Sequence, residues 1–182
     1  MHIPTHILSG WCVANYFELS PRERFWCMAA ASVSDVDGLG ILFGEEAYWD
    51  YHHVVGHNLL FATVFSILFA VFSRHRLKVL LLCLALFHLH FVLDFFGSGP
   101  QWEIVYLWPF SRWGAETEHA WELFSWQNIT AAALLLVWML VIAVRQGRSP
   151  LEWPLPEMDR KFVAWLRGKM RAAPPGSVEP EV

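Results

Sequence analysis

The stretch LKVLLLCLALFHLHFVLD, residues 77–94, decides the fold of this chain. Its length falls within the roughly 17 to 25 residues that a transmembrane helix needs. Most of it carries only one charged side chain, Lys78, whereas two histidines and Asp94 gather near its end. We therefore interpret it as a membrane-spanning helix that presents polar groups near one membrane face.

Two further apolar segments, residues 58–73 and 128–144, have a similar composition. Three such segments so close together are rare in a buried soluble core, which predicts an all-α integral membrane helical bundle. Two weaker apolar stretches, residues 5–19 and 25–34, precede them and predict a helical hairpin with Ser20 as an N-cap at its turn. We thus expect about five helices: three strong spans plus the N-terminal helical hairpin.

The composition agrees with a membrane protein. Of the 182 residues, 55% are hydrophobic and 16% are charged, whereas soluble domains carry about 25% charged residues. The formal net charge is -4 and no long basic run is present, so we expect no nucleic-acid partner. We divide the chain into a membrane domain at residues 1–148 and a cytoplasmic tail at residues 149–182.

The tail changes character after Pro150, because further prolines break any continuing helix. Residues 157–172 predict a short, basic, amphipathic helix, and residues 174–182 predict a disordered end. The helix suits the anionic cytoplasmic leaflet. It would equally suit a position packed beneath the bundle, and the sequence leaves both interpretations open.

Charge is distributed unevenly between the two faces that alternating helices would create. All of the 13 Lys and Arg residues except Arg112 fall on one side. The positive-inside rule makes these basic loops and the C-terminus cytoplasmic. The extracytoplasmic face collects acidic residues, together with a cluster of tryptophans and tyrosines between Tyr48 and Trp126 that is typical of an interfacial belt.

Histidines and aspartates from separate segments gather at this extracytoplasmic face. On a helix, residues four apart share a face, with their Cβ atoms about 6 Å apart. His53 and His57 have this spacing at the opening of the first strong span, and His90 and Asp94 have it at the end of the second. Each pair is spaced to chelate one ion from one helix face.

Further groups complete the predicted site. Asp35 and Asp37 lie in a D-x-D turn, and His6 starts the first helix. His52 adjoins His53, and either one could be the ligand while the other supports it. An acidic residue in a membrane helix is costly unless it is paired or coordinated. Imidazoles with carboxylates suit a divalent metal ion, zinc first, with manganese or iron if carboxylates dominate.

The motifs appear along the chain as Thr5-His6, Asp35-x-Asp37, HHxxxH from His52 to His57, His90-x-x-x-Asp94 and Trp108-Pro109-Phe110-Ser111. Over about residues 1–145 this order resembles the bacterial family of predicted membrane-bound metal-dependent hydrolases, which is distantly similar to zinc-dependent phospholipase C. The resemblance implies a bacterial inner-membrane location. It also implies as ligands or near-ligands His6, Asp35, Asp37, His52 or His53, His57, His90 and Asp94.

The chain departs from that family around HHxxxH. The family often reads His-Arg-Gly-x-Thr-His-Ser, whereas here His53 stands in place of the Arg, and Gly56 and Asn58 stand in place of the Thr and Ser. Where that Arg and Thr grip a phosphate, a phosphoester substrate is less favoured for this chain. The resemblance therefore implies a site more firmly than a reaction.

A membrane-bound metal-dependent hydrolase is the first function that these features predict. A bound divalent ion would activate water, Asp35 or Asp37 would take its proton, and the expected substrate is a lipid or lipid-linked ester or phosphoester. The alternative is a non-catalytic metal-binding membrane protein, either a sensor or an assembly factor. Transport is disfavoured because residues 58–73 and 128–144 contain no charged residue. Membrane lipids are the expected partners, and the oligomeric state is open.

Overall fold

The computed structural model describes residues 1–100 and 102–171, and every regular element longer than an isolated bridge in that part of the chain is helical. The elements are α1 (Ile3–Ala14), α2 (Pro21–Ala30), the 3-10 helix η1 (Val33–Phe43), α3 (Glu45–Tyr51), α4 (Leu59–Val71), α5 (Arg76–Gly97), α6 (Trp126–Gln146) and α7 (Pro156–Arg171). The predicted all-α membrane bundle is confirmed.

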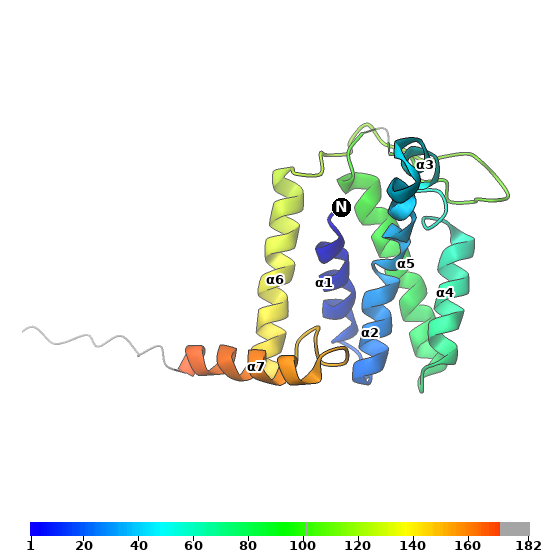
Figure 1. Cartoon of the computed structure of the whole chain (residues 1–182). Helices are drawn as coiled ribbons and strands as arrows, with labels where there is room; N and C mark the ends of the chain where they lie inside the picture. Colours follow the sequence, from blue (N-terminus) through cyan, green and yellow to red (C-terminus); the bar gives the residue numbers. More distant parts are fainter. Residues whose placement is uncertain (101, 172–182) are drawn as a thin grey trace, which may run out of the picture.

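The helices α1, α2, α4, α5 and α6 form an up-and-down bundle, and α7 lies across one end of it (Figure 1). α5 packs against α2 and α4, and α1 packs between α2 and α6. The crossing of α1 and α2 depends on Gly10, because a Cβ there would lie 2.6 Å from the Cys27 carbonyl oxygen. This close contact fixes where α1 stands relative to the rest of the bundle.

Two helices, α5 and α6, are long and apolar enough to cross a membrane. The expected span at residues 58–73 differs, since its helix α4 has 13 residues and at 1.5 Å per residue reaches only about 20 Å. A third candidate span comes instead from α2 and η1. Together these two helices are long and apolar enough to cross a membrane, but they are bent by 51° relative to each other. Beyond the bend, η1 continues toward the end of the bundle that carries α3 (Figure 1).

The predicted N-terminal hairpin is present as α1 and α2. Ser20 caps α2, and its side chain and that of Glu23 form a capping box with each other's backbone N–H. The sequence did not predict η1 or α3, which occupy the expected D-x-D turn and the residues after it. These two short elements lie at the same end of the bundle as the N-terminus (Figure 1).

The tail contains the expected amphipathic helix as α7. Its Val163 is buried against the end of α6, whereas Met158 and Trp165 remain more than half exposed. Packing beneath the bundle is therefore observed, and association of the exposed apolar side chains with a leaflet stays a prediction. The predicted disordered end, residues 174–182, lies outside the described residues.

The two ends of the bundle differ in chemistry. α1, α4 and α6 begin at the end that carries η1 and α3, and α2 and α5 finish there (Figure 1). Basic residues that begin or end helices, such as Arg22, Arg76 and Arg145, consequently lie at the other end. The basic residues that the sequence places on one side therefore lie at one end of the bundle, opposite the end that carries η1 and α3.

Asn128, in the first turn of α6, holds that helix against the end of α5. Its side-chain amide donates to the carbonyl oxygens of Gly97 and Leu123 and accepts from the Trp121 indole N–H. We expect Asn128→Ala to lower the free energy of unfolding by about 2–4 kcal/mol, because several buried polar groups lose their partner. Thermal unfolding in detergent would measure this loss. Thr130→Ala, at an exposed position of the same helix, is the control and should change stability little.

Candidate metal centre

The site begins with His90 and Asp94, one turn apart on α5. Both side chains are about 1% exposed or less, and His90 Nε2 lies 2.9 Å from Asp94 Oδ2. The predicted pairing of residues four apart on one helix face is therefore confirmed for these two groups. Because they sit near the end of a candidate span, they place the site at one end of the bundle rather than at its middle.

Side chains from two other segments join this pair. His57, just before α4, places its Nε2 3.0 Å from His90 Nε2 and 3.3 Å from Asp94 Oδ2. Asp35, on η1, places its Oδ1 3.6 Å from His90 Nε2. Ligands of one zinc ion, each bound at about 2.0–2.2 Å, lie within roughly 4.4 Å of one another. These donor atoms are therefore close enough to one another for metal coordination.

The imidazoles of His57 and His90 are oriented by their other ring nitrogens. His90 Nδ1 lies 2.8 Å from the Ala31 carbonyl oxygen, which can only accept a hydrogen bond. His57 Nδ1 lies 2.9 Å from Asp37 Oδ2. With Nδ1 of both rings donating, the two Nε2 lone pairs meet at 3.0 Å, an arrangement that requires a proton or a cation between them. The residues present thus fit a metal ion.

Burial and neighbouring charged groups favour the protonated form of His57 and the neutral form of His53. Burial acts to lower the pKa of His57, but its hydrogen bonds to Asp37 and Asp94 outweigh burial and raise that pKa to about 9. Burial and the neighbouring His57 lower the pKa of His53 well below its usual value. A metal ion that binds His57 would therefore displace a proton, so metal affinity should fall as the pH decreases.

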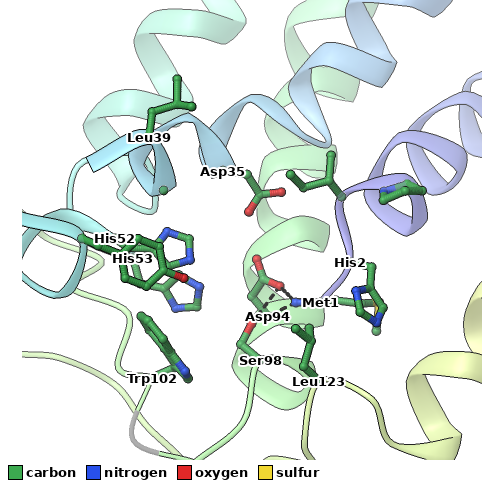
Figure 2. Close-up of a pocket in the computed structure, with 14 residues that line it drawn as sticks. Met1, His2, Asp35, Leu39, His52, His53, Asp94, Ser98, Trp102 and Leu123 are labelled. Carbon is green, nitrogen blue, oxygen red and sulfur yellow. Dashed lines mark hydrogen bonds and ion pairs between the residues drawn. The ribbon is translucent and has the colours of Figure 1, made fainter. Parts of the chain in front are cut away.

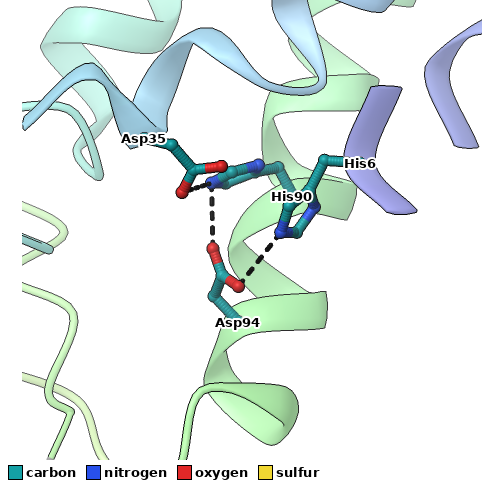
Figure 3. Close-up of side chains that lie close together, drawn as sticks. All are labelled: His6, Asp35, His90 and Asp94. Carbon is teal, nitrogen blue, oxygen red and sulfur yellow. Dashed lines mark hydrogen bonds and ion pairs between the residues drawn. The ribbon is translucent and has the colours of Figure 1, made fainter. Parts of the chain in front are cut away.

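His6 and His53 both lie close to the Asp94 carboxylate. His6 Nε2, from α1, is 3.1 Å from Asp94 Oδ1, which also contacts the amino group of Met1. Figure 3 shows His6, Asp35, His90 and Asp94 pointing toward one another; their ligand atoms all lie within 4.8 Å. A second group with the same spacing consists of His53, His57 and Asp94. Asp94 belongs to both.

The expected helical pairing of His53 with His57 was wrong. α3 ends at Tyr51 and α4 begins at Leu59, so both histidines lie in the irregular segment between them. Their rings are nevertheless close, with centroids 4.3 Å apart. The segment achieves this with a left-handed backbone at His53, whose φ is 64°.

Asp37 supports the imidazoles rather than facing His90 and Asp94. Its carboxylate accepts hydrogen bonds from His57 Nδ1, from the Gly56 backbone N–H and from His52 Nδ1, at 2.9, 2.9 and 2.7 Å. Carboxylates in this position fix the ring orientation of metal-binding histidines. His52 belongs to neither group of potential ligands. All eight predicted site residues thus lie at this end of the bundle, and the geometry separates those that could hold an ion from those that orient the imidazoles.

A cavity of about 570 Å³ adjoins the cluster. Asp35, His53 and Asp94 line it, and apolar residues such as Leu39 and Leu123 complete its wall (Figure 2). Trp102 also lines it, with its ring centroid 5.3 Å from that of His53. Sequence analysis placed Trp102 only in an aromatic belt, because nothing in the sequence near it indicated that its loop folds over the histidines.

Comparison with known proteins gives one result. The family model described as YdjM inner membrane protein matches residues 1–158. The chain therefore belongs to the YdjM inner membrane protein family. No curated protein and no solved structure matches the chain significantly.

The role of Asp37 predicts a specific effect on metal binding. We expect Asp37→Asn to weaken zinc affinity about 10- to 100-fold, because His57 loses a charged acceptor that holds its ring in place. Competition with a chromophoric chelator would measure the change on purified protein. Asp50→Asn, which neutralises an exposed carboxylate on nearby α3, is the control. Equal affinity in the wild type and Asp37→Asn would contradict the role of Asp37.

Proposed function

We propose that this member of the YdjM inner membrane protein family is a metal-dependent hydrolase that acts on a lipid or lipid-linked ester or phosphoester. The observation that carries the proposal is a buried cluster of imidazoles and carboxylates with unpartnered atoms beside a cavity. Among the described residues, His6 Nδ1, Asp35 Oδ2 and His53 Nδ1 are buried without a hydrogen-bond partner. Buried polar atoms without partners are rare in native proteins and call for an explanation, such as an ion or a substrate.

The residues that would hold a metal ion are His6, Asp35, His53, His57, His90 and Asp94. Imidazole and carboxylate donors suit zinc, with manganese or iron as alternatives. When bound, such an ion polarises the scissile group and lowers the pKa of a water molecule to about 7.

We assign the role of general base to Asp35. Its side chain is 11% exposed and borders the cavity, and its Oδ2 has no hydrogen-bond partner in the described part of the chain. Asp37 is less suited to this role, because it is fully buried and already accepts three hydrogen bonds. In this assignment Asp35 Oδ2 takes the proton of the attacking water, and Asp37 holds the imidazole of His57.

A lipid substrate is supported by the surroundings of the cavity. η1 carries Leu39, Ile41, Leu42 and Phe43, all more than half exposed, at the end of the bundle where α5 finishes and α6 begins (Figure 1). An exposed apolar group of this size suits contact with acyl chains. We infer that the cluster lies at headgroup level on the extracytoplasmic face, with the basic end of the bundle and the C-terminus in the cytoplasm.

The alternative, a non-catalytic metal-binding protein acting as a sensor or assembly factor, needs the same donors but a closed coordination sphere. The cavity beside Asp35 and His53 favours the hydrolase, because it gives water and a substrate access to the cluster. A substrate-sized space beside the donors has no role in a closed metal site.

Hydrolysis should depend on both a metal ion and Asp35. We expect purified protein to hydrolyse at least one member of a panel of phospholipids and lipid-linked esters, and to lose this activity with a chelator until zinc or manganese is restored. Asp35→Asn should lower kcat about 100-fold or more, because the general base is lost. Release of the headgroup or acyl chain would be measured by mass spectrometry.

The matched control is Asp50→Asn, which should retain full activity because Asp50 is exposed and lies outside both groups of potential ligands. Bound metal is measured in every variant, so that a loss of metal is separated from a loss of base. Turnover that is absent across the panel, or that is unaffected by the chelator, would count decisively against the hydrolase.

A further inference from the structure

We propose that the centre binds two metal ions bridged by Asp94. One ion lies among His6, Asp35, His90 and Asp94, and the second lies among His53, His57 and Asp94. The inference extends the proposed function, since it takes the same cluster as a metal centre and specifies how many ions it holds.

The number of donors exceeds what one ion takes. Zinc usually has four ligands, and catalytic sites use about three from the protein. Six side chains offer ligand atoms here, and they divide into two groups, each with its atoms within 4.8 Å of one another. Asp94 is the only residue in both groups among the described residues. Two ions with three or four protein donors each therefore account for all six side chains.

Both oxygens of the Asp94 carboxylate face imidazoles. Its Oδ1 faces His6 Nε2 at 3.1 Å, whereas its Oδ2 faces His90 Nε2 at 2.9 Å and His57 Nε2 at 3.3 Å. The two oxygens thus point toward imidazoles that come from different segments of the chain. In two-metal hydrolytic sites the ions lie about 3.5–4 Å apart, a separation that a carboxylate can span with one oxygen on each ion.

The ring of His53 gives independent support for the second ion. The residue is 2% exposed and its Nδ1 has no hydrogen-bond partner among the described residues. Its ring packs against Trp102 and His57 at centroid distances of 5.3 and 4.3 Å. An imidazole buried with a free ring nitrogen beside a second imidazole is oriented as a ligand rather than as a packed core residue.

The backbone of His53 has an uncommon conformation. Its φ of 64° lies in the left-handed region, which is unfavourable for most side chains. The conformation is held by the Val105 backbone N–H, which donates to the His53 carbonyl oxygen at 3.2 Å. Such strain persists where the surrounding structure enforces it, commonly at functional sites. A glycine would also fit this backbone conformation.

This conformation provides a variant that separates folding from metal binding. His53→Gly removes the ligand while suiting the left-handed backbone; because it also removes a buried ring, thermal unfolding of the metal-free variant is measured beside its metal content. Full-length protein would be stripped with a chelator, incubated with zinc and analysed by mass spectrometry for metal per chain. We expect about two ions in the wild type and about one in His53→Gly.

Variants of the other donors complete the test. His6→Ala should also bind about one ion, and combining it with His53→Gly should lower the count below that of either variant. Asp94→Asn should weaken both sites. His119→Ala, at an exposed histidine outside both groups, should bind as the wild type does.

Spectroscopy tests the bridge separately from the count. With manganese in place of zinc, a carboxylate-bridged pair should give the electron paramagnetic resonance spectrum of two coupled ions, and His53→Gly should give that of an isolated ion. A wild type that binds about one ion, or an uncoupled spectrum at full loading, would overturn the two-ion centre. Hydrolysis with one ion would leave the proposed function intact, and two coupled ions without hydrolysis would contradict the hydrolase alone.

Discussion

The carboxyl group of Asp94 lies almost fully buried at the end of an apolar helix, where a charge is costly unless other groups compensate for it. Only one of the imidazoles that contact it, His90, comes from the same helix. The others, His6 and His57, come from α1 and from the segment before α4. Distant parts of the chain must therefore meet at the end of α5. The contacts of His6 and His57 with Asp94 are needed for folding as well as for any chemistry at this site.

The same condition explains why the bundle is regular at one end and irregular at the other. Long helices satisfy their own backbone groups in an apolar environment, whereas side chains that must approach Asp94 from several directions need elements with other geometries. η1 and residues 52–58 are these elements: Asp35 extends from η1, and His53 and His57 extend from residues 52–58. The second segment contains the left-handed backbone at His53 and the hydrogen bond from Gly56 to Asp37, and in it His52 contacts Asp37 whereas the neighbouring His53 lies near Asp94.

The features that were predictable from the sequence are those that local rules determine. The spans α5 and α6 follow from length and hydropathy, the start of α2 follows from a capping residue, and the pairing of His90 with Asp94 follows from helical periodicity. The pairing of His53 with His57 failed because it assumed the same periodicity outside a helix. Their proximity instead depends on contacts such as that between His53 and Val105, which join parts of the chain that sequence spacing does not relate.

Asp35 and Asp37 show why the type of residue was easier to predict than its role. A D-x-D motif suggests two carboxylates at one ion, but a 3-10 helix has three residues per turn, so residues two apart point about 120° away from each other around its axis. Asp35 consequently faces His90, whereas Asp37 contacts the Nδ1 atoms of His52 and His57. The motif identifies the donors, and their place on a helix rather than in a turn separates them, so that one could meet an ion while the other orients the imidazoles that would bind it.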